Sequence, residues 1–367
     1  MKAVVLGVGR MGTAIAYAMS KLGFDVIGMD TNIQAVKNMP KENSEFFLVH
    51  DVEDIFGKIV SHCPAPDVVI SSLPYHQTEE VGTWCVDNGL RYCDLGGRVD
   101  VSANINEWAK NRPASAPVFT DLGLAPGWVN ILAEEGCRKL HGTADEVEMM
   151  VGGLPDYSQS TRNPLRYAVT WSVDGLINEY RDDCLILEDG EIKTVKGMGG
   201  LIKVEGENFG QMEAFYTSGG ASHSIHSMRS RGVKNCSYRT LRYRGHRDIV
   251  KFLIKDCDLN DEALNNIFLR GCGFADEDEV FIVAEVKGGD KTWRKETIIK
   301  FDENFSAMQK ATAFPISSIA SLMAEGLLEG DKDEHRDYYT QYNKSLAYSD
   351  VPFDLFKERL SILGIET

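Results

Sequence analysis

The motif Gly7-Val8-Gly9-Arg10-Met11-Gly12 constrains the fold of this chain more than any other stretch, because of what stands on either side of it. A short Val-rich run, Lys2 to Leu6, leads into the motif. Apolar residues spaced three and four apart follow it until Gly23, and a second apolar run covers Phe24 to Asp30. This succession predicts a strand, a glycine turn, a helix and a second strand.

A turn of this kind can bind a dinucleotide. Gly7 allows the tight turn, Gly9 lets the backbone approach a pyrophosphate, and Gly12 lets the helix pack closely on the strand. The helix N-terminus offers N–H groups and the positive end of its dipole to the phosphates. Asp30 ends the second strand, where a carboxylate can accept hydrogen bonds from the adenosine ribose. Because Asp30 would repel a 2′-phosphate and Thr31-Asn32 supplies no cation, we expect NAD rather than NADP. The alternative is a turn that only packs an α/β unit.

Four further apolar runs continue the alternation of strands and helices. They cover Phe46–Val49, Asp67–Pro74, Arg91–Asp94 and Pro117–Asp121. Six strands with helical crossovers predict a doubly wound parallel sheet, whose ligands lie beyond the carboxyl ends of the strands. The expected cofactor-binding residues are Gly7, Gly9, Arg10, Met11, Gly12, Asp30, Ser72, Leu73, Pro74 and Asp94, with Tyr75 and His76 facing the substrate. For the serines, ordinary turn chemistry is an equal alternative.

The middle of the chain changes character. Asp189-Gly190 separates two apolar runs, and Gly288-Gly289-Asp290 separates Val280–Val286 from Thr297–Phe301. Both patterns predict hairpins, and strands are also expected at 146–151, 211–217 and 237–243. These features predict an α+β region with a mostly antiparallel sheet. The acidic run 276–279 is expected to be a solvated loop.

Helical patterns return near the end of the chain. A helix is expected after Pro315, with Ile316, Ile319 and Met323 on its apolar face. A charged linker at 329–337 and a final amphipathic helix at 352–363 follow.

Composition excludes several classes of protein. The chain has 39 Lys and Arg against 55 Asp and Glu, so its net charge of −16 argues against a partner among duplex nucleic acids or anionic membranes. It has no apolar run long enough to span a bilayer and no export signal. Its eight Cys form no Cys-x-x-Cys pair, so we expect reduced thiols in a cytoplasmic protein. His223 and His226 lie three apart without a third ligand beside them, so no metal site is expected.

Several stretches together resemble the saccharopine dehydrogenase family, in particular its branch of lysine 6-dehydrogenases and saccharopine reductases. They are Gly7–Gly12, Asp121–Gly127, Gly153–Asp156, Asn163–Tyr167, Thr170–Tyr180, Glu213–Thr217 and Thr240–His246. The Trp171-Ser172 and Leu241-Arg242-Tyr243 stretches are the most specific of these. Members often carry Thr, Leu or Pro where Ala221 to His226 stands here, so the substrate need not be lysine.

The resemblance implies a Rossmann domain, residues 1–122 and 312–367, interrupted by a substrate-binding and dimerisation domain at 123–311. It also implies a homodimer that performs NAD(P)-linked oxidation or reduction at the CH–NH group of an amino acid, such as lysine or a saccharopine-like imino acid. Asp121, Ser172 and Arg242 map to catalytic positions, and Trp171, Ser172 and Arg242 to substrate-binding positions. The alternatives are a carboxynorspermidine-type reductase and a catalytically silent NAD-binding or NAD-sensing protein.

The chemistry of these residues is consistent with that activity. Oxidising a CH–NH group leaves an imine and requires a neutral amine, so a base or an ordered water must take the amine proton. Asp121 could act as that base or orient it. Arg242 could bind an α-carboxylate, although an Arg in a strand is more often exposed or paired. An aldehyde dehydrogenase would need a nucleophilic Cys where the helix after Pro126 begins, and Cys137 lies mid-helix.

Overall fold

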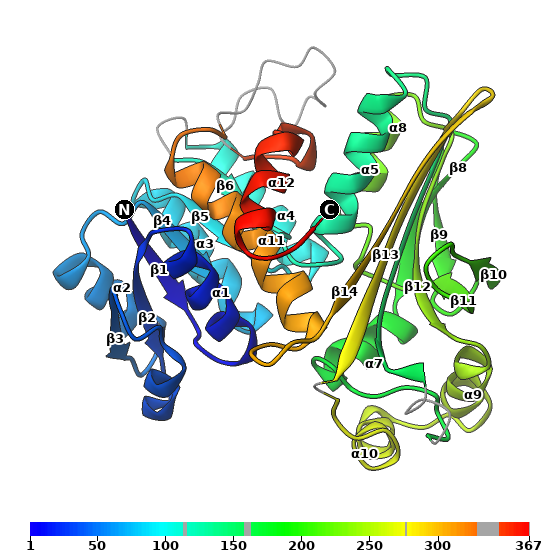
Figure 1. The fold of residues 1–367 in the computed structure, drawn as a ribbon, viewed down its shortest axis with the longest axis horizontal. Coiled ribbons are helices and arrows are strands. Elements are labelled where there is room, and N and C mark those ends of the chain that lie inside the picture. Colours follow the sequence, from blue (N-terminus) through cyan, green and yellow to red (C-terminus); the bar gives the residue numbers. More distant parts are fainter. Residues whose placement is uncertain (113–115, 158–162, 276, 329–344, 367) are drawn as a thin grey trace. The chain divides into compact units, whose positions relative to one another are not determined.

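The computed structural model describes residues 1–367 except 113–115, 158–162, 276, 329–344 and 367. The chain forms two compact units, which are described separately (Figure 1). Unit 1 comprises Met1–Ile131 and Ala311–Thr367, and unit 2 comprises Leu132–Lys310. Among the described residues, no helix is long and apolar enough to cross a membrane.

Unit 1 contains a parallel sheet of six strands in the order β3-β2-β1-β4-β5-β6. The strands are β1 Lys2–Leu6, β2 Asp25–Asp30, β3 Ser44–Leu48, β4 Val68–Ser71, β5 Tyr92–Asp94 and β6 Val118–Phe119. Chain order and sheet order agree with a doubly wound fold, which confirms the predicted fold class. Strands β1 and β4 are apolar along most of their length and buried, as strands covered on both faces must be.

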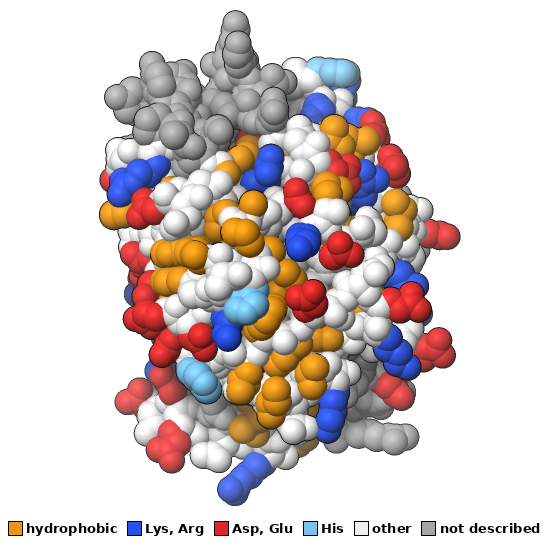
Figure 2. Space-filling model, turned by 90° about the vertical axis from the view of Figure 1, so that its left-hand side faces the viewer, with side chains coloured by type: hydrophobic (Ala, Val, Ile, Leu, Met, Phe, Trp, Pro, Cys, Tyr) orange, Lys and Arg blue, Asp and Glu red, His pale blue; other side chains and the backbone are white. Residues whose placement is uncertain are grey.

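Helices cover this sheet (Figure 1). They are α1 Arg10–Lys21, α2 Val52–His62, α3 Tyr75–Asp87, α4 Val99–Lys110, α11 Ala307–Ala324 and α12 Phe353–Ile362, with 3-10 turns at Ile33–Asn38 and Tyr348–Asp350. Helix α5, Trp128–Lys139, begins in unit 1 and continues into unit 2. On the face drawn in Figure 2, acidic and basic side chains are interspersed, with hydrophobic side chains gathered between them.

The predicted start of the late helix was wrong. Helix α11 begins at Ala307 and contains Pro315 in its interior. Ser306 and Gln309 cap it reciprocally: Ser306 N donates to Gln309 Oε1 at 3.1 Å, and Gln309 N to Ser306 Oγ at 3.2 Å. This cap and the burial of the apolar residues on both sides of Pro315 outweigh the hydrogen bond that proline removes. The predicted linker at 329–337 lies outside the described residues.

Unit 2 is built on an eight-stranded sheet, ordered β10-β11-β12-β7-β13-β14, in which β8 pairs with β12 and β9. The strands are β7 Glu146–Pro155, β8 Asp183–Glu188, β9 Glu191–Lys196, β10 Ile202–Glu205, β11 Gln211–Tyr216, β12 Asn235–Tyr243, β13 Asp278–Gly288 and β14 Lys291–Lys300. Only the β12–β7 pair is parallel among them, which confirms a mostly antiparallel sheet. The unit's helices are α7 Val173–Arg181, α8 Ser224–Ser230, α9 His246–Lys251 and α10 Asp261–Gly271, with a π-helical turn at Phe252–Asp256.

Two sequence predictions for this unit need correction. Strand β14 begins at Lys291 rather than Thr297, because the polar residues Arg294 and Glu296 form ion pairs on the sheet instead of a loop. The acidic run is not a solvated loop at Asp278, which is buried in β13. Its carboxylate accepts hydrogen bonds from the N–H groups of Ala307 and Met308, at 2.6 and 3.0 Å. Asp276 lies outside the described residues.

Candidate functional site

The glycine turn of unit 1 has the geometry that close packing and ligand approach require. Gly7 adopts a φ of 78°, in the left-handed region. A Cβ on Gly12 would lie 1.7 Å from the Gly7 carbonyl oxygen, so only glycine is possible there. A Cβ on Gly9 would meet nothing within 4 Å, which leaves its backbone open to a ligand. Arg10 and Met11 follow in the first turn of α1, where Arg10 is exposed and Met11 half-buried.

Asp30 is fixed beside this turn. Its Oδ2 accepts a hydrogen bond from Val8 N at 2.7 Å, and its Oδ1 accepts one from Asn32 N at 2.8 Å. Each carboxylate oxygen can accept more than one hydrogen bond, so ribose hydroxyls could still bind there. The glycine turn and Asp30 therefore fit a dinucleotide.

Of the residues that follow β4, Ser72 and Leu73 lie at the glycine turn. Ser72 Oγ donates to the Gly7 carbonyl at 2.9 Å, and the Leu73 side chain lies 3.3 Å from a Cβ placed on Gly7. The structure thus brings these two predicted residues to the glycine turn. Pro74 is the N-cap residue of α3. Tyr75 and His76 begin that helix with exposed side chains, and their rings lie 5.9 Å apart in an edge arrangement.

Two buried carboxyl groups stand at the ends of β5 and β6. Asp94 Oδ1 accepts hydrogen bonds from Gly96 N at 2.8 Å and from Asp121 N at 3.1 Å, while Asp121 Oδ1 accepts one from Ser102 Oγ at 2.6 Å. Asp94 Oδ2 has no hydrogen-bond partner in the described chain. Burial, and then the charge of Asp121, raise the pKa of Asp94 to about 7. Asp121 has a φ of 63°, and the Tyr348 hydroxyl donates to its carbonyl at 2.9 Å. The pair can hold one proton near neutral pH.

Arg242 is buried in unit 2, with 3% of its surface exposed. Its Nε donates to the Tyr180 hydroxyl and its Nη1 to the Leu241 carbonyl, both at 2.9 Å. Its guanidinium carbon lies 4.8 Å from the centre of the Tyr167 ring. In the described part of the chain it forms no ion pair. Burial raises the pKa of the half-buried Glu179 to about 7, against the lowering effect of the Arg242 charge.

Two buried hydroxyl groups, Tyr167 OH and Thr170 Oγ1, lie in the neighbouring stretch of chain. Neither forms a hydrogen bond of good geometry within the described residues, although Thr170 and Trp171 lie close enough to Tyr167 to lower its pKa slightly. Burial raises the pKa of Tyr167 above its usual value, so its hydroxyl stays protonated and can donate. Sequence reasoning missed Tyr167, Thr170 and Tyr180. Their positions within the two stretches shared with the family, 163–167 and 170–180, were the only available signal.

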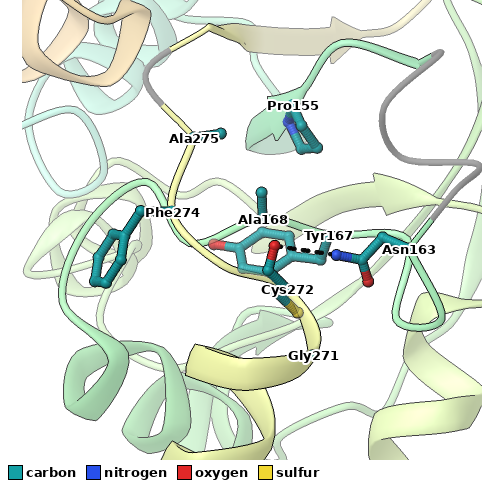
Figure 3. A pocket seen from close by; sticks show the side chains of 8 residues that line it. All are labelled: Pro155, Asn163, Tyr167, Ala168, Gly271, Cys272, Phe274 and Ala275. Atoms are coloured by element: carbon teal, nitrogen blue, oxygen red, sulfur yellow. Dashed lines mark hydrogen bonds between the residues drawn. The ribbon is translucent and has the colours of Figure 1, made fainter.

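A cavity of about 280 Å³ opens beside Tyr167 (Figure 3). It is lined by Pro155, Asn163, Tyr167, Ala168, Gly271, Cys272, Phe274 and Ala275. Asn163 Nδ2 donates to the Cys272 carbonyl at 3.2 Å and holds one wall. The cavity reaches the buried Tyr167 side chain.

Trp171 and Ser172 have structural contacts of their own. Trp171 is half-buried, and a Cβ on Gly175 would come within 2.5 Å of its ring, so the indole packs against α7. Ser172 is the N-cap of α7, and its Oγ accepts a hydrogen bond from Gly175 N at 3.2 Å. The cap explains this serine without catalysis. Its catalytic role stays a prediction.

The histidines that were considered as metal ligands have other surroundings. His223 precedes α8, and burial, followed by the charge of His226, lowers its pKa to about 4. The described residues contain no group of three or more His, Cys, Asp or Glu arranged to hold a metal ion.

Comparison with protein families decides the membership of the chain. A model of the saccharopine dehydrogenase C-terminal domain matches residues 123–344, which is more than half of the chain. The chain belongs to the saccharopine dehydrogenase family. A model of the NAD binding domain of 6-phosphogluconate dehydrogenase also matches residues 2–90. The family resemblance recognised from the motifs is therefore confirmed.

Individual relatives agree with this membership at low identity. The chain is similar to the mitochondrial alpha-aminoadipic semialdehyde synthase of Rattus norvegicus, with 28% identity over 53% of this chain and 21% of the relative. It is also similar to the saccharopine dehydrogenase [NADP(+), L-glutamate-forming] of Saccharomyces cerevisiae, with 26% identity over 56% of this chain and 46% of the relative. The chain thus covers less than half the length of these curated relatives.

A solved structure agrees over nearly the whole chain. The apo saccharopine dehydrogenase (L-Glu forming) from Saccharomyces cerevisiae superposes with a TM-score of 0.70 and 15% identity, over 99% of this chain and 98% of that chain. At this identity the likeness concerns the fold.

Proposed function

We propose that this protein is a nicotinamide-dependent oxidoreductase acting on the CH–NH group of an amino acid, with lysine or a saccharopine-like imino acid as substrate. In this proposal the Rossmann domain expected from the sequence at residues 1–122 and 312–367 binds the dinucleotide. Residues 123–311 bind the amino acid. Family membership and the dinucleotide-compatible glycine turn support the class of reaction.

The observation that carries the proposal is the buried, unpaired guanidinium of Arg242. A guanidinium cannot lose its charge, and a buried charge without a counter-charge is costly. Arg242 Nη2 donates no hydrogen bond within the described chain, and the Tyr167 ring lies 4.8 Å from the guanidinium carbon. Planar, charge-assisted donation is the geometry that a carboxylate prefers. A substrate carboxylate would therefore complete this cluster.

We propose NAD as the cofactor. The nicotinamide accepts or donates the hydride when bound, and the residues of this chain hold the dinucleotide in place. Gly9 gives its pyrophosphate an open approach, and Asp30 offers carboxylate oxygens to the adenosine ribose. The negative charge of Asp30 opposes a 2′-phosphate, although the yeast relative is named for NADP(+).

In the same proposal the carboxyl pair manages the amine proton. Asp121 stands at the carboxyl end of β6, where ligands of such sheets bind, and Asp94 shares its environment. With a pKa near 7, Asp94 can bind or release a proton near neutral pH. An ionised carboxylate can take the proton from an ammonium, directly or through water, so that the neutral amine reacts.

The test is a substrate screen with both nucleotides. Purified protein is incubated with NAD or NADP and a panel of lysine, saccharopine, glutamate and other amino acids, and the absorbance of the reduced cofactor is followed. The reductive direction is tested with NADH. We expect turnover with NAD and a basic or imino amino acid. Turnover only when a polyamine is joined to an aldehyde would instead favour the carboxynorspermidine-type reaction. If calorimetry shows that NAD binds but no turnover occurs in either direction, the proposed enzymatic activity would be contradicted, and a catalytically silent NAD-binding protein would be favoured.

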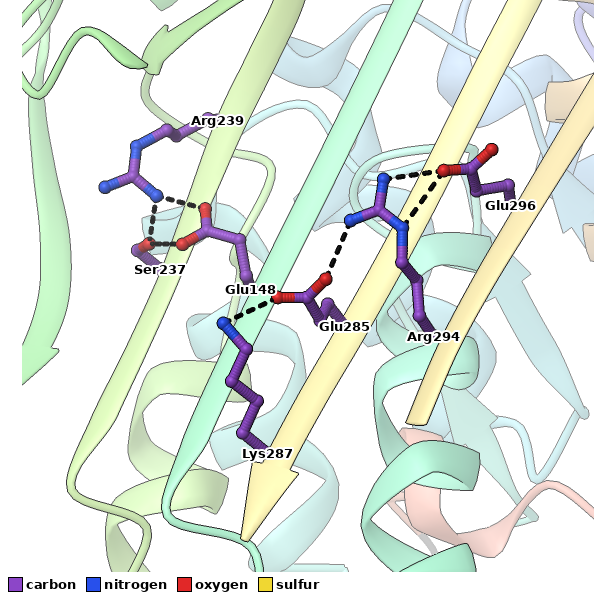
Figure 4. Close-up of polar contacts among 7 residues, drawn as sticks. All are labelled: Glu148, Ser237, Arg239, Glu285, Lys287, Arg294 and Glu296. Atoms are coloured by element: carbon purple, nitrogen blue, oxygen red, sulfur yellow. Dashed lines mark hydrogen bonds and ion pairs between the residues drawn. The ribbon is translucent and has the colours of Figure 1, made fainter. Parts of the chain in front are cut away.

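The homodimer expected from the sequence remains a prediction, testable by light scattering at micromolar protein. Part of one sheet face of unit 2 carries the ion-paired residues of Figure 4, so apolar burial alone would not drive association there.

A further inference from the structure

We infer that His246 positions Arg242 through the Tyr180 hydroxyl, as a neutral, Nδ1-protonated imidazole. This inference rests on the proposed function in one respect, namely that Arg242 binds the substrate carboxylate. All the groups involved lie in unit 2, and all are buried.

The imidazole contacts fix its tautomer. His246 Nδ1 lies 2.6 Å from the Leu165 carbonyl oxygen, and His246 Nε2 lies 2.9 Å from the Tyr180 hydroxyl. A carbonyl oxygen can only accept, so Nδ1 must carry a proton. Burial, and then the Arg242 charge, lower the pKa of His246 to about 3, which keeps the ring neutral. Nε2 is therefore an acceptor, and the Tyr180 O–H donates to it.

The direction of the next hydrogen bond follows. Because the Tyr180 proton is committed to His246, the Tyr180 oxygen presents its lone pairs to Arg242 Nε, which donates at 2.9 Å. If His246 donated from Nε2 instead, the Tyr180 proton would turn towards Arg242 and oppose its N–H. This chain of hydrogen bonds from His246 through Tyr180 to Arg242, called the relay below, therefore holds Nε of the guanidinium. It fixes the plane in which the terminal nitrogens lie.

The position of His246 is itself locked by the backbone. Gly245 adopts a φ of 93°, and His246 is the first residue of α9. The Glu213 carboxylate accepts hydrogen bonds from Gly245 N at 2.9 Å and Arg247 N at 2.7 Å. One carboxylate thus holds the backbone N–H groups of the residues immediately before and after His246. The stretch 240–246 therefore contains both Arg242 and the histidine that positions it, His246.

A matched pair of variants separates positioning from general packing. In His246→Asn the amide can still donate to the Leu165 carbonyl, but its side chain is too short to accept from Tyr180. His246→Gln carries an acceptor at the distance of Nε2. We expect His246→Asn to raise KM for the amino acid about tenfold, while kcat and the Kd for NADH change less than twofold. His246→Gln should restore KM to within about threefold of wild type.

Tyr180→Phe tests the same relay at its central residue. It removes the hydroxyl that both neighbours use, so its effect on KM should match that of His246→Asn. Combining the two substitutions should add little, since both break one chain of hydrogen bonds. Additive effects would contradict the relay. Circular dichroism and thermal unfolding confirm that each variant is folded.

Nuclear magnetic resonance tests the relay independently of turnover. Long-range ¹H–¹⁵N spectra should show His246 protonated at Nδ1 only, without titration between pH 5 and 8. The Arg242 Nε–H should exchange slowly with solvent in wild type and His246→Gln, and faster in His246→Asn. A proton on Nε2, a titration near pH 6.5, or unchanged Arg242 exchange in His246→Asn would overturn the inference. No turnover by wild type, with these spectra as expected, would refute the proposed function alone. A wild-type KM in His246→Asn would refute the positioning role alone.

Discussion

Strand β12 carries two buried arginines whose surroundings differ. Arg239 forms an ion pair with Glu148 and donates to Ser237 Oγ at 3.0 Å and to the Tyr216 hydroxyl at 2.8 Å (Figure 4). Arg242 stands three positions later, where side chains of a strand point to the opposite face. Its partners are a hydroxyl and a carbonyl, and in the described chain no carboxylate pairs with it.

We propose that this difference separates a structural charge, Arg239, from a charge that binds a ligand, Arg242. Arg239 is satisfied within the chain, and a separate group of ion pairs, Glu285, Arg294 and Glu296, lies on the neighbouring strands (Figure 4). Arg242 is buried at similar depth without an ion pair in the described chain, and Glu179 acts on its charge only from beyond ion-pair distance. A fold does not retain an uncompensated buried cation for stability, because an apolar residue of similar volume would serve better. We propose that a substrate carboxylate supplies the paired counter-charge of Arg242.

The largest effect is expected from Arg242→Met. Losing charge-assisted hydrogen bonds to a carboxylate costs roughly 2–5 kcal/mol, so KM for the amino acid should rise at least about 30-fold. Thermal stability should be unchanged or higher, because a buried unpaired charge is removed. Initial rates and thermal unfolding measure both quantities. A large loss of stability would make Arg242 a structural residue like Arg239.

Arg239→Met is the matched control on the same strand. It leaves the Glu148 carboxylate without its partner, and we expect the free energy of unfolding to fall by roughly 1–3 kcal/mol. The side chain of Glu148 is 26% exposed, which limits the cost. KM should stay within twofold of wild type. Urea unfolding and initial rates check this pattern, and a KM effect equal to that of Arg242→Met would remove the distinction between the two arginines.

Asp94→Asn extends the comparison to a buried acid. A buried carboxyl group can lose its charge by binding a proton, whereas a guanidinium cannot lose its charge. The pKa of Asp94 is raised to about 7 in the folded protein, from near 4 when unfolded. The folded state thus binds the Asp94 proton more tightly than the unfolded state does. The stability that this proton contributes is lost as the pH rises from about 4 through 7. Wild type should lose roughly 2–3 kcal/mol relative to Asp94→Asn between pH 5 and 8. Urea unfolding at both pH values would show parallel changes if Asp94 were ionised throughout.

Ser172→Ala should have the smallest effect. Removing the N-cap of α7 is expected to cost about 1 kcal/mol of stability, with kcat and KM within twofold of wild type. Ser172→Asp, which can still cap the helix, serves as the control. A loss of kcat in both variants would instead support the catalytic role predicted from the sequence.

The sequence predicted unit 1 more completely than unit 2 for a physical reason. In a parallel sheet each strand is a continuous apolar run bounded by turns, so β1 and β2 were found almost to the residue. Strand β4 was located too, but the predicted run extended three residues beyond its end at Ser71. In unit 2, strand β14 begins with polar residues that pair across the sheet, and local patterns do not record such pairs. The burial of Asp278 depends on the N-terminus of α11, which is distant in sequence.

The candidate site shows the same limit. Gly7, Gly12 and Asp30 could be recognised because their roles follow from backbone geometry within one βαβ unit. Arg242 could be named as a carboxylate ligand, but not distinguished from Arg239, since only the fold reveals which arginine has a carboxylate partner. The positioning role inferred for His246 could not be predicted from the sequence either, because its partners Leu165 and Tyr180 are distant from it in the chain.

The most direct test of the account compares an amino acid with the amine that lacks its carboxylate. The values of kcat/KM for lysine and cadaverine, or for saccharopine and its decarboxylated analogue if saccharopine is the substrate, are measured in wild type and Arg242→Met. We predict that wild type prefers the carboxylate-bearing substrate by at least about 30-fold, and that Arg242→Met loses this preference. An equal preference in both proteins would contradict a carboxylate-binding role for Arg242.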